Sequence, residues 1–294
     1  MLFEGSCVAV VTPFDEDGQI NFETYGKLLD WHIEQGTDAI LTCGTTGEAA
    51  AMNDAEHKSV MKFAVDHVAG RVPVIAGTGS NDTAYAIQLS QYAESVGANG
   101  LLVVSPYYNK STQEGMIAHF TAIADSVKTP IILYNVPGRT GINIEASTIA
   151  ALSAHPNICG VKEASGNISQ CADIARLCPD DFQMWSGNDD MIVPLMSLGG
   201  SGVISVIANI MPKETSQIVH TYLDGDTKGA LAMQLSMNAL VHQLFVETNP
   251  IPVKKAMSLM DLCGGTMRLP LIDIQPKNEV TLVVEMKNIG LLEV

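Results

Sequence analysis

A lysine that closes a short apolar run near the middle of the chain has the setting for carbonyl chemistry. Residues 158–161 are Ile-Cys-Gly-Val, and Lys162 follows them directly. If this run is a strand, alternate side chains share a face, so Lys162 lies with Ile158 and Gly160. Burial on that face favours the neutral amine, which attacks a carbonyl carbon to make a Schiff base. A lysine that only reaches solvent from a strand end is the ordinary alternative.

Other polar groups follow other apolar runs. Tyr134 closes the run before that of Lys162, so its phenol could exchange protons with an imine, although a core tyrosine is the plainer reading. Thr45 and Thr46 lie between two glycines and suit a small carboxylate, or form a simple turn. Arg139, one of four arginines, follows Pro-Gly and could clamp a carboxylate or lie on the surface. Together these signals predict one site.

The elements that must position these groups repeat along the first two thirds of the chain. Eight apolar runs alternate with helical patterns, such as residues 21–35 and 81–96, the latter with Asn81 as the expected cap. The runs start about 28 residues apart, the size of one βα unit, which predicts a closed (β/α)8 TIM barrel with its reactive groups at the C-terminal strand ends. The runs are residues 7–11, 39–41, 73–76, 100–104, 130–134, 158–162, 182–186 and 202–205.

The remainder of the chain reads as helices. Patterns over residues 213–223, 227–246, 252–262 and 277–292 predict an α-helical appendage, so we expect a barrel domain over 1–224 and a helical domain over 225–294. Residues 191–211 carry no ionisable charge and are long enough to cross a bilayer, but Pro194 and Gly199-Gly200 instead predict a buried helix, a turn and a buried strand.

The composition restricts the partners. The 294 residues carry a formal net charge of −16, which argues against nucleic acid or an anionic membrane as a partner. Only 16% of residues are charged and 47% are hydrophobic, so we expect part of the surface to be covered by another subunit. The six cysteines have no C-x-x-C spacing, and residues 1–14 lack Lys and Arg, which predicts free thiols in a reducing compartment and no signal peptide.

Several other chemistries lack their motifs. The chain has no G-x-G-x-x-G, no phosphate-binding P-loop and no G-x-S-x-G, which removes the dinucleotide, nucleotide and serine-hydrolase interpretations. No two of the seven histidines have a helical spacing that favours a transition metal. Asp189 and Asp190 could hold a divalent ion, but we expect them to cap the helix that follows.

Three motifs give the chain a resemblance to a known family. They are Gly44-Thr-Thr-Gly-Glu48, Tyr134-Asn-Val-Pro137 with Arg139-Thr140, and Gly160-Val-Lys-Glu-Ala164. The chain resembles, over its whole length, the dihydrodipicolinate synthase family of the pyruvate-dependent class I aldolases, which also include N-acetylneuraminate lyase. The resemblance implies a lyase that condenses pyruvate with aspartate semialdehyde in lysine and diaminopimelate biosynthesis. It further implies a cytoplasmic homotetramer made of two tight dimers, with neither a metal nor a dissociable cofactor.

The resemblance also assigns roles to individual residues. Lys162 forms the Schiff base with pyruvate, Tyr134 donates and accepts protons, and Thr45 completes the proton relay with Tyr108 of a neighbouring subunit. The remaining four residues hold the substrates. Thr46 and the Ile204 backbone bind the pyruvate carboxylate, Gly187 lies close to bound substrate, and Arg139 recruits the carboxylate of the semialdehyde.

Three alternatives stay open on the sequence. A sibling lyase, acting on N-acetylneuraminate or a keto-deoxy sugar acid, would use the same lysine, but Thr46 and Arg139 favour the synthase. A barrel that only binds small carboxylates would have no need of Lys162, Tyr134 and both threonines. A metal-dependent class II aldolase is the third.

Some members of the family are inhibited by L-lysine at the tight-dimer interface, and the resemblance places that site on this chain as well. Asn81, His57 and Tyr107 match the pattern. Ala49, Asp54 and Tyr85 depart from it, and Tyr85 replaces a glutamate that would pair with the lysine ammonium. An ammonium without that partner is costly to bury, so we expect weak inhibition or none, although Asp54 could supply a charge from a different place.

Overall fold

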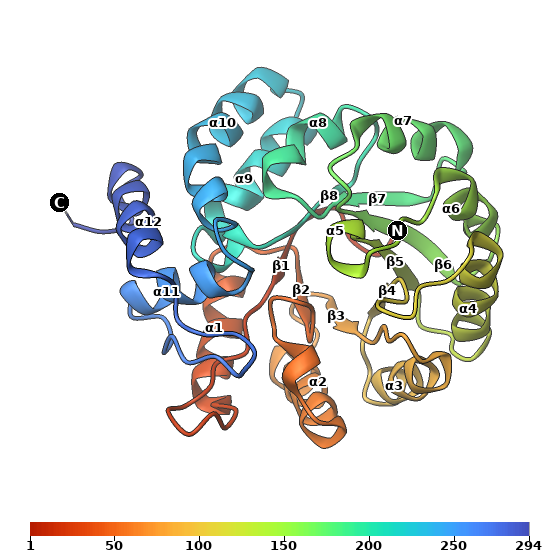
Figure 1. The fold of residues 1–294 in the computed structure, drawn as a ribbon. Helices are drawn as coiled ribbons and strands as arrows, with labels where there is room; N and C mark the ends of the chain where they lie inside the picture. Colours follow the sequence, from red (N-terminus) through yellow and green to blue (C-terminus); the bar gives the residue numbers. More distant parts are fainter. Residues whose placement is uncertain (294) are drawn as a thin grey trace.

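Eight parallel strands form a closed barrel in which each strand pairs with the next and β8 pairs with β1 (Figure 1). The structure, a computed structural model, describes residues 1–293. This arrangement confirms the expected (β/α)8 TIM barrel, with most strand ends within one residue of the apolar runs. The strands are β1 (Gly5–Ala9), β2 (Ala39–Thr42), β3 (Val74–Gly77), β4 (Gly100–Val104), β5 (Ile131–Asn135), β6 (Ile158–Glu163), β7 (Gln183–Ser186) and β8 (Gly202–Ser205).

Helices surround the barrel and continue beyond it (Figure 1). The expected uncharged segment after β7 is confirmed as a short buried helix, a glycine turn and β8. The longer helices are α1 (Phe22–Glu34), α2 (Asp54–Val68), α3 (Thr83–Ser95), α4 (Gln113–Asp125), α6 (Ala146–Ser153), α7 (Ile168–Leu177), α9 (Pro212–Leu223), α10 (Thr227–Gln243), α11 (Ile251–Leu259) and α12 (Pro276–Asn288), and the short ones are α5 (Pro137–Thr140) and α8 (Ile192–Met196).

Polar side chains set the starts of several helices. Asn21 accepts a hydrogen bond from the Thr24 backbone N–H at the start of α1, and Asn53 forms a capping box with Glu56 at the start of α2. The prediction that Asn81 caps α3 is wrong. Asp82 is the cap, because its carboxylate accepts the Ala84 N–H while the helix begins at Thr83.

The strand alternation divides the core into an inner and an outer layer. Inside the barrel, Tyr134, Trp185 and Ile204 belong to one apolar cluster, and Phe3 stacks on Trp185 with ring centroids 4.8 Å apart. Val161 belongs instead to the outer cluster, between the strands and the helices. The next residue on β6, Lys162, therefore faces inward, as the alternation predicted.

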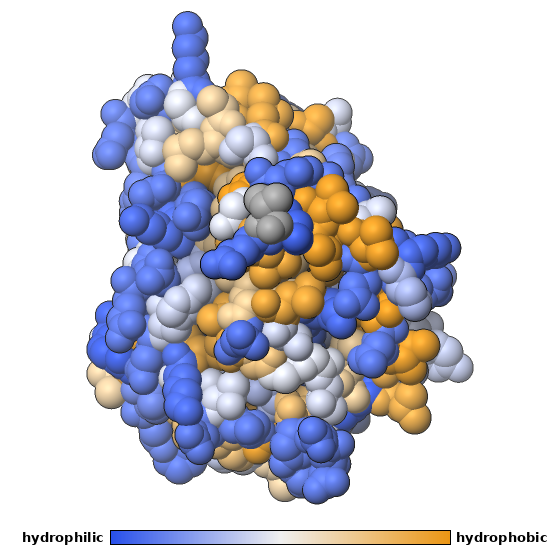
Figure 2. Space-filling view, turned by 90° about the vertical axis from the view of Figure 1, so that its left-hand side faces the viewer, coloured by the Kyte–Doolittle hydropathy of each residue, from blue (hydrophilic) through white to orange (hydrophobic). Residues whose placement is uncertain are grey.

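The C-terminal helices share a buried apolar cluster with helices of the barrel. Leu28 of α1, Ile218 of α9, Met237 of α10 and Leu282 of α12 all belong to it. On the face that carries these helices, apolar side chains are exposed among polar ones (Figure 2). The exposed apolar residues of α10 and α12 are Leu231, Leu235, Val280 and Val284. Within residues 1–293, no helix has both the length and the apolar character that a membrane span requires.

Candidate active site

Lys162 and Tyr134 are direct neighbours at the C-terminal ends of β6 and β5. The strand register pairs the two residues, and both side chains are buried. The Lys162 Nζ atom lies 4.5 Å from the centre of the Tyr134 ring. Among residues 1–293, the Lys162 Nζ atom has neither an ion pair nor a hydrogen bond with the protein. The barrel thus holds a buried primary amine beside a phenol, with no carboxylate paired to it.

A buried polar network holds these two strand ends together from the outside of the barrel. Asn135 and Glu163 follow Tyr134 and Lys162 and pair in the same register. The Glu163 carboxylate accepts hydrogen bonds from Asn135 Nδ2 at 2.9 Å, from Gln170 Nε2 at 3.0 Å and from the Ser165 N–H at 2.7 Å. Because both carboxylate oxygens are engaged, the network fixes β5 against β6, and with them the spacing of the lysine and the tyrosine.

A glycine gives the Lys162 side chain its room. A Cβ atom on Gly187 would lie 3.0 Å from Lys162 Cε and 2.6 Å from the Ala164 Cβ, so a larger residue would push into the lysine. The Gly187 N–H donates to the Glu163 carbonyl at 2.7 Å, which keeps the backbone close. Ile204, on β8, is fully buried inside the barrel with Tyr134.

The loop after β2 folds into a tight turn. The N–H groups of Gly47 and Glu48 donate to the carbonyls of Gly44 and Thr45, both at 3.1 Å. A Cβ on Gly47 would lie 3.2 Å from the Val10 carbonyl, so glycine allows the close approach to the chain just after β1. The Thr45 side chain is exposed, whereas Thr46 is 2% exposed.

The Glu48 carboxylate of this turn forms a buried ion pair with the C-terminal helices. Lys254 of α11, fully buried, donates to Glu48 Oε1 at 2.5 Å and to the Thr266 carbonyl at 2.8 Å. Arg268 then binds Glu56 of α2 through two hydrogen bonds, at 2.6 and 2.9 Å. The C-terminal segment therefore anchors the turn that carries the two threonines. Sequence reasoning missed Lys254 and Arg268, for which no local motif exists.

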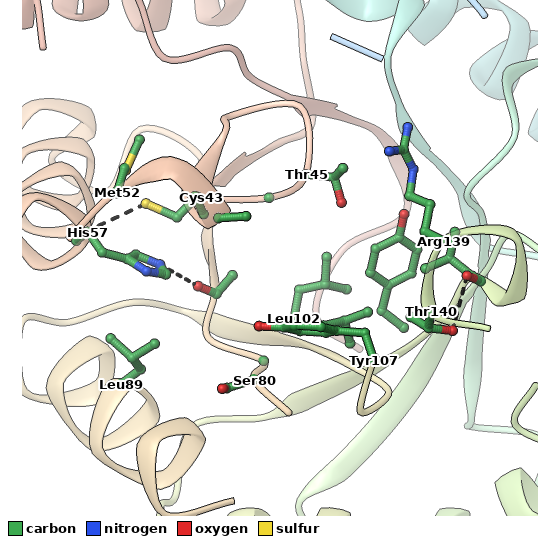
Figure 3. A pocket seen from close by; sticks show the side chains of 18 of the residues that line it. Cys43, Thr45, Met52, His57, Ser80, Leu89, Leu102, Tyr107, Arg139 and Thr140 are labelled. Carbon is green, nitrogen blue, oxygen red and sulfur yellow. Dashed lines mark hydrogen bonds between the residues drawn. The ribbon is translucent and has the colours of Figure 1, made fainter. Parts of the chain in front are cut away.

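A cavity of about 410 Å³ joins the two groups of predicted residues. Thr45, Tyr134 and Arg139 line it together with Ala49, His57, Tyr85 and Tyr107. Figure 3 shows Thr45 and Arg139 across the cavity from His57. The cavity lining does not include the predicted residues Thr46, Tyr108, Lys162, Gly187, Ile204, Asp54 and Asn81. Lys162 contacts the cavity wall from behind, since its Nζ atom lies over the ring of Tyr134, which lines the cavity.

Arg139 lies in the short helix α5 with its side chain exposed, and Nη2 donates to the Asn249 carbonyl at 3.4 Å. Tyr108 is 90% exposed, and its backbone has a left-handed φ of 68°. The structure thus places Arg139 on the cavity wall and leaves Tyr108 exposed.

The prediction that Asp189 and Asp190 cap the helix that follows them is wrong for Asp189, whose carboxylate binds backbone groups after β8 instead. Its side chain is 3% exposed and accepts the N–H groups of Val206 and Ile207, at 3.0 and 2.9 Å, just after β8. Burial raises the pKa of this carboxyl, and the Lys162 charge acts in the opposite direction. The residue therefore fixes the backbone after Ile204. Within residues 1–293, no three His, Cys, Asp or Glu side chains gather as a metal site would require.

Four residues of the predicted regulatory site line the cavity, namely Ala49, His57, Tyr85 and Tyr107, and several of its residues make polar contacts with neighbours outside the set. The Asp54 carboxylate accepts a hydrogen bond from Lys58 Nζ at 2.8 Å, and Lys58 and the nearby Tyr85 hydroxyl lower its pKa. His57 Nε2 lies 2.9 Å from the Gly77 carbonyl, and burial lowers the pKa of this imidazole. The Asn81 carbonyl accepts from Asn109 Nδ2 at 2.9 Å.

The chain is similar to known proteins over nearly its whole length. The model of the dihydrodipicolinate synthetase family matches residues 2–289. The 4-hydroxy-tetrahydrodipicolinate synthase of Thermoanaerobacter pseudethanolicus is 55% identical over 293 residues, which cover 99% of this chain and 98% of that protein.

Two solved structures are similar as well. The crystal structure of dihydrodipicolinate synthase from Aquifex aeolicus superposes with a TM-score of 0.97 at 43% identity, covering 99% of this chain and all of that one. The enzyme from Cyanidioschyzon merolae, solved with lysine bound, gives a TM-score of 0.96 at 40% identity over 99% of both chains. On its barrel, its three motifs and this similarity along its whole length, the chain belongs to the dihydrodipicolinate synthetase family.

Proposed function

We propose that this chain is a 4-hydroxy-tetrahydrodipicolinate synthase, a lyase that condenses pyruvate with L-aspartate-4-semialdehyde in lysine and diaminopimelate biosynthesis. The observation that carries the proposal is the buried Lys162 amine, 4.5 Å from the Tyr134 ring, which itself lines a cavity shared with Thr45 and Arg139. A full-length relative at 55% identity has the same activity in its name.

The chemistry begins at the Lys162 amine. Its nitrogen attacks the keto carbon of pyruvate, and the carbinolamine loses water to give an iminium ion. Loss of a methyl proton then gives an enamine, whose carbon attacks the aldehyde carbon of the semialdehyde while the aldehyde oxygen takes a proton. The amino group of the semialdehyde attacks the iminium carbon and displaces Lys162. Because the iminium accepts the electron pair, these steps call for no metal and no dissociable cofactor.

Proton transfers are assigned to Tyr134 with Thr45 and Tyr108. Tyr134 is supported by its contact with Lys162, and Thr45 by its place on the same cavity. Tyr108 is assigned to the site of a neighbouring subunit. This assignment is supported by its 90% exposure, which leaves the side chain free to contact another copy of the chain.

Substrate carboxylates are assigned to two places. Thr46 and the backbone at Ile204 hold the pyruvate carboxylate beside Lys162, and Gly187 leaves space for it. Arg139 holds the carboxylate of the semialdehyde, supported by its guanidinium on the cavity wall.

The assembly and location proposed for the chain follow the same family. We assign it as a homotetramer of two tight dimers in the cytoplasm, supported by its exposed apolar side chains and its six free cysteines. Residues 1–224 form the catalytic barrel in this assignment, and residues 225–294, the last of which lies outside the described residues, form the helical domain.

Weak or absent inhibition by L-lysine is also part of the proposal. Tyr85 supplies no carboxylate, and the Asp54 carboxylate already binds Lys58. An incoming ammonium would have to compete with Lys58.

Borohydride trapping tests the proposed function. Reduction in the presence of pyruvate should inactivate the protein and add a pyruvate-derived mass to the peptide that contains Lys162. Turnover of aspartate semialdehyde but not N-acetylmannosamine separates the synthase from a sibling lyase, and full activity in a chelator separates it from a class II aldolase. An unmodified Lys162 would overturn the proposal.

A further inference from the structure

One residue of the C-terminal segment contacts both groups to which the carboxylates are assigned. Asn249 follows α10, is 4% exposed, and donates from Nδ2 to Thr46 Oγ1 at 3.0 Å. Its backbone carbonyl accepts the Arg139 Nη2 at 3.4 Å. No motif pointed to Asn249, which lies 203 residues from Thr46 in the sequence.

The direction of the bond to Thr46 determines what that hydroxyl can do. A threonine hydroxyl has one proton and two lone pairs. When the Asn249 amide donates to one lone pair, the hydroxyl proton stays free to be donated elsewhere. A carboxylate only accepts hydrogen bonds, so Thr46 can bind it only as a donor. The amide therefore holds Thr46 in the state that a carboxylate requires.

The rest of the Asn249 amide indicates that it serves the site rather than the fold. Its Oδ1 atom is buried and has no hydrogen-bond partner among residues 1–293. A buried acceptor without a partner costs stability, so packing alone would favour an apolar side chain here.

We propose that Asn249 is a positioning residue for pyruvate, which acts by orienting the Thr46 hydroxyl; this rests on the proposed function. The side chain of Asn249 serves Thr46, whereas only its backbone serves Arg139. Substituting the side chain should therefore weaken the binding of pyruvate and leave the binding of the semialdehyde unchanged.

The test uses two variants of the full chain. Asn249→Asp keeps the shape but replaces the donor with an acceptor, so Thr46 must donate to it and can no longer donate to pyruvate. We expect the pyruvate concentration at half-maximal borohydride trapping to rise by about 100-fold in Asn249→Asp and by about tenfold in Asn249→Ala. KM for the semialdehyde should change less than about twofold to threefold. Asn288→Ala, an exposed asparagine of α12, is the matched control and should behave as the unsubstituted chain.

A double-mutant cycle with Thr46→Val separates positioning from a structural role. If Asn249 acts through Thr46, adding Asn249→Ala to Thr46→Val changes pyruvate trapping no further, even if Asn249→Ala alone lowers the melting temperature. Additive effects, or unchanged trapping in a folded Asn249→Asp, would overturn the inference alone. Absence of trapping in the unsubstituted chain would instead overturn the proposed function and this inference with it.

Discussion

Two lysines are buried within residues 1–293, and their surroundings differ in a way that separates a reactive amine from a structural one. Each Nζ lies over an aromatic ring, Lys162 at 4.5 Å from the centre of Tyr134 and Lys254 at 4.3 Å from that of Phe14. Lys254 has the Glu48 carboxylate as a partner, whereas Lys162 has no ion pair within residues 1–293. The ring over Lys162 carries a hydroxyl, and the ring over Lys254 does not.

The difference shows that burial alone does not make a lysine a nucleophile. Burial lowers the pKa of Lys254, but Glu48 acts against this and favours the charged form, which cannot attack a carbonyl. Lys162 lacks such a partner and has a phenol that can move protons. One lysine is therefore suited to hold two parts of the chain together, and the other to form and break a covalent bond.

Replacing each lysine by methionine gives the largest expected effect and the strongest test of the comparison. Lys162→Met should lower kcat/KM by at least about 10⁴-fold, because the nucleophile is lost. Its melting temperature should equal or exceed that of the unsubstituted chain, since no counter-charge is left unpaired. Steady-state kinetics and thermal melting measure both. Activity within tenfold of the unsubstituted chain would remove Lys162 from the chemistry.

Tyr134→Phe makes the surroundings of Lys162 resemble those of Lys254. The ring stays over the amine while the hydroxyl is lost, so kcat should fall by about 10²–10⁴-fold, the usual contribution of a general acid or base. Pyruvate should still be trapped with half-saturation within a few-fold of the unsubstituted chain. A variant that turns over at the normal rate would show that another group moves the protons.

Lys254→Met should act on stability. It leaves the Glu48 carboxylate buried with no cation, which costs about 3–5 kcal/mol of unfolding free energy. The double variant Glu48→Gln, Lys254→Met should recover much of this loss. Urea unfolding at a fixed protein concentration measures both. Equal stability of Lys254→Met and the unsubstituted chain would refute the structural role.

His32 shows how burial acts on a base that has no partner. It is fully buried, its ring nitrogens have no hydrogen-bond partner among the described residues, and burial lowers its pKa to about 3. Below about pH 6.5 the unfolded chain binds a proton that the folded chain does not, so stability is full above that pH and falls as the pH drops. The expected loss by pH 5 is about 2 kcal/mol. His32→Leu should flatten this dependence, and an unchanged slope would assign it to other groups.

Inhibition by L-lysine should be the smallest effect. The ammonium of the added lysine would face Tyr85, which has no carboxylate, and Asp54, whose carboxylate already binds Lys58. Initial rates should therefore change little up to millimolar L-lysine. Half-inhibition well below ~1 mM, which means binding stronger than about −4 kcal/mol, would contradict this. Tyr85→Glu should then increase the sensitivity.

The sequence by itself determined the barrel and the face of its central lysine. Period-two alternation along residues 158–162 was enough to place Lys162 inside, because side chains alternate about a strand whatever surrounds it. The spacing of the apolar runs determined the eight βα units for the same local reason. The start of α3 was less well determined by the sequence, because both Asn81 and Asp82 are residue types that can cap a helix. In the structure the helix begins at Thr83, so Asp82 occupies the capping position.

Only the tertiary structure decided which distant residues complete the site. Asn249 and Lys254 reach Thr46 and Glu48 across more than 200 positions, and Asp189 binds the backbone after β8 instead of capping its own helix. Hydrogen bonds of this kind depend on how the C-terminal helices pack on the barrel, which leaves no periodic or local signal in the sequence. In the sequence, a single asparagine or lysine looks the same whether its side chain is exposed to solvent or buried against a loop that lies about 200 residues earlier in the chain.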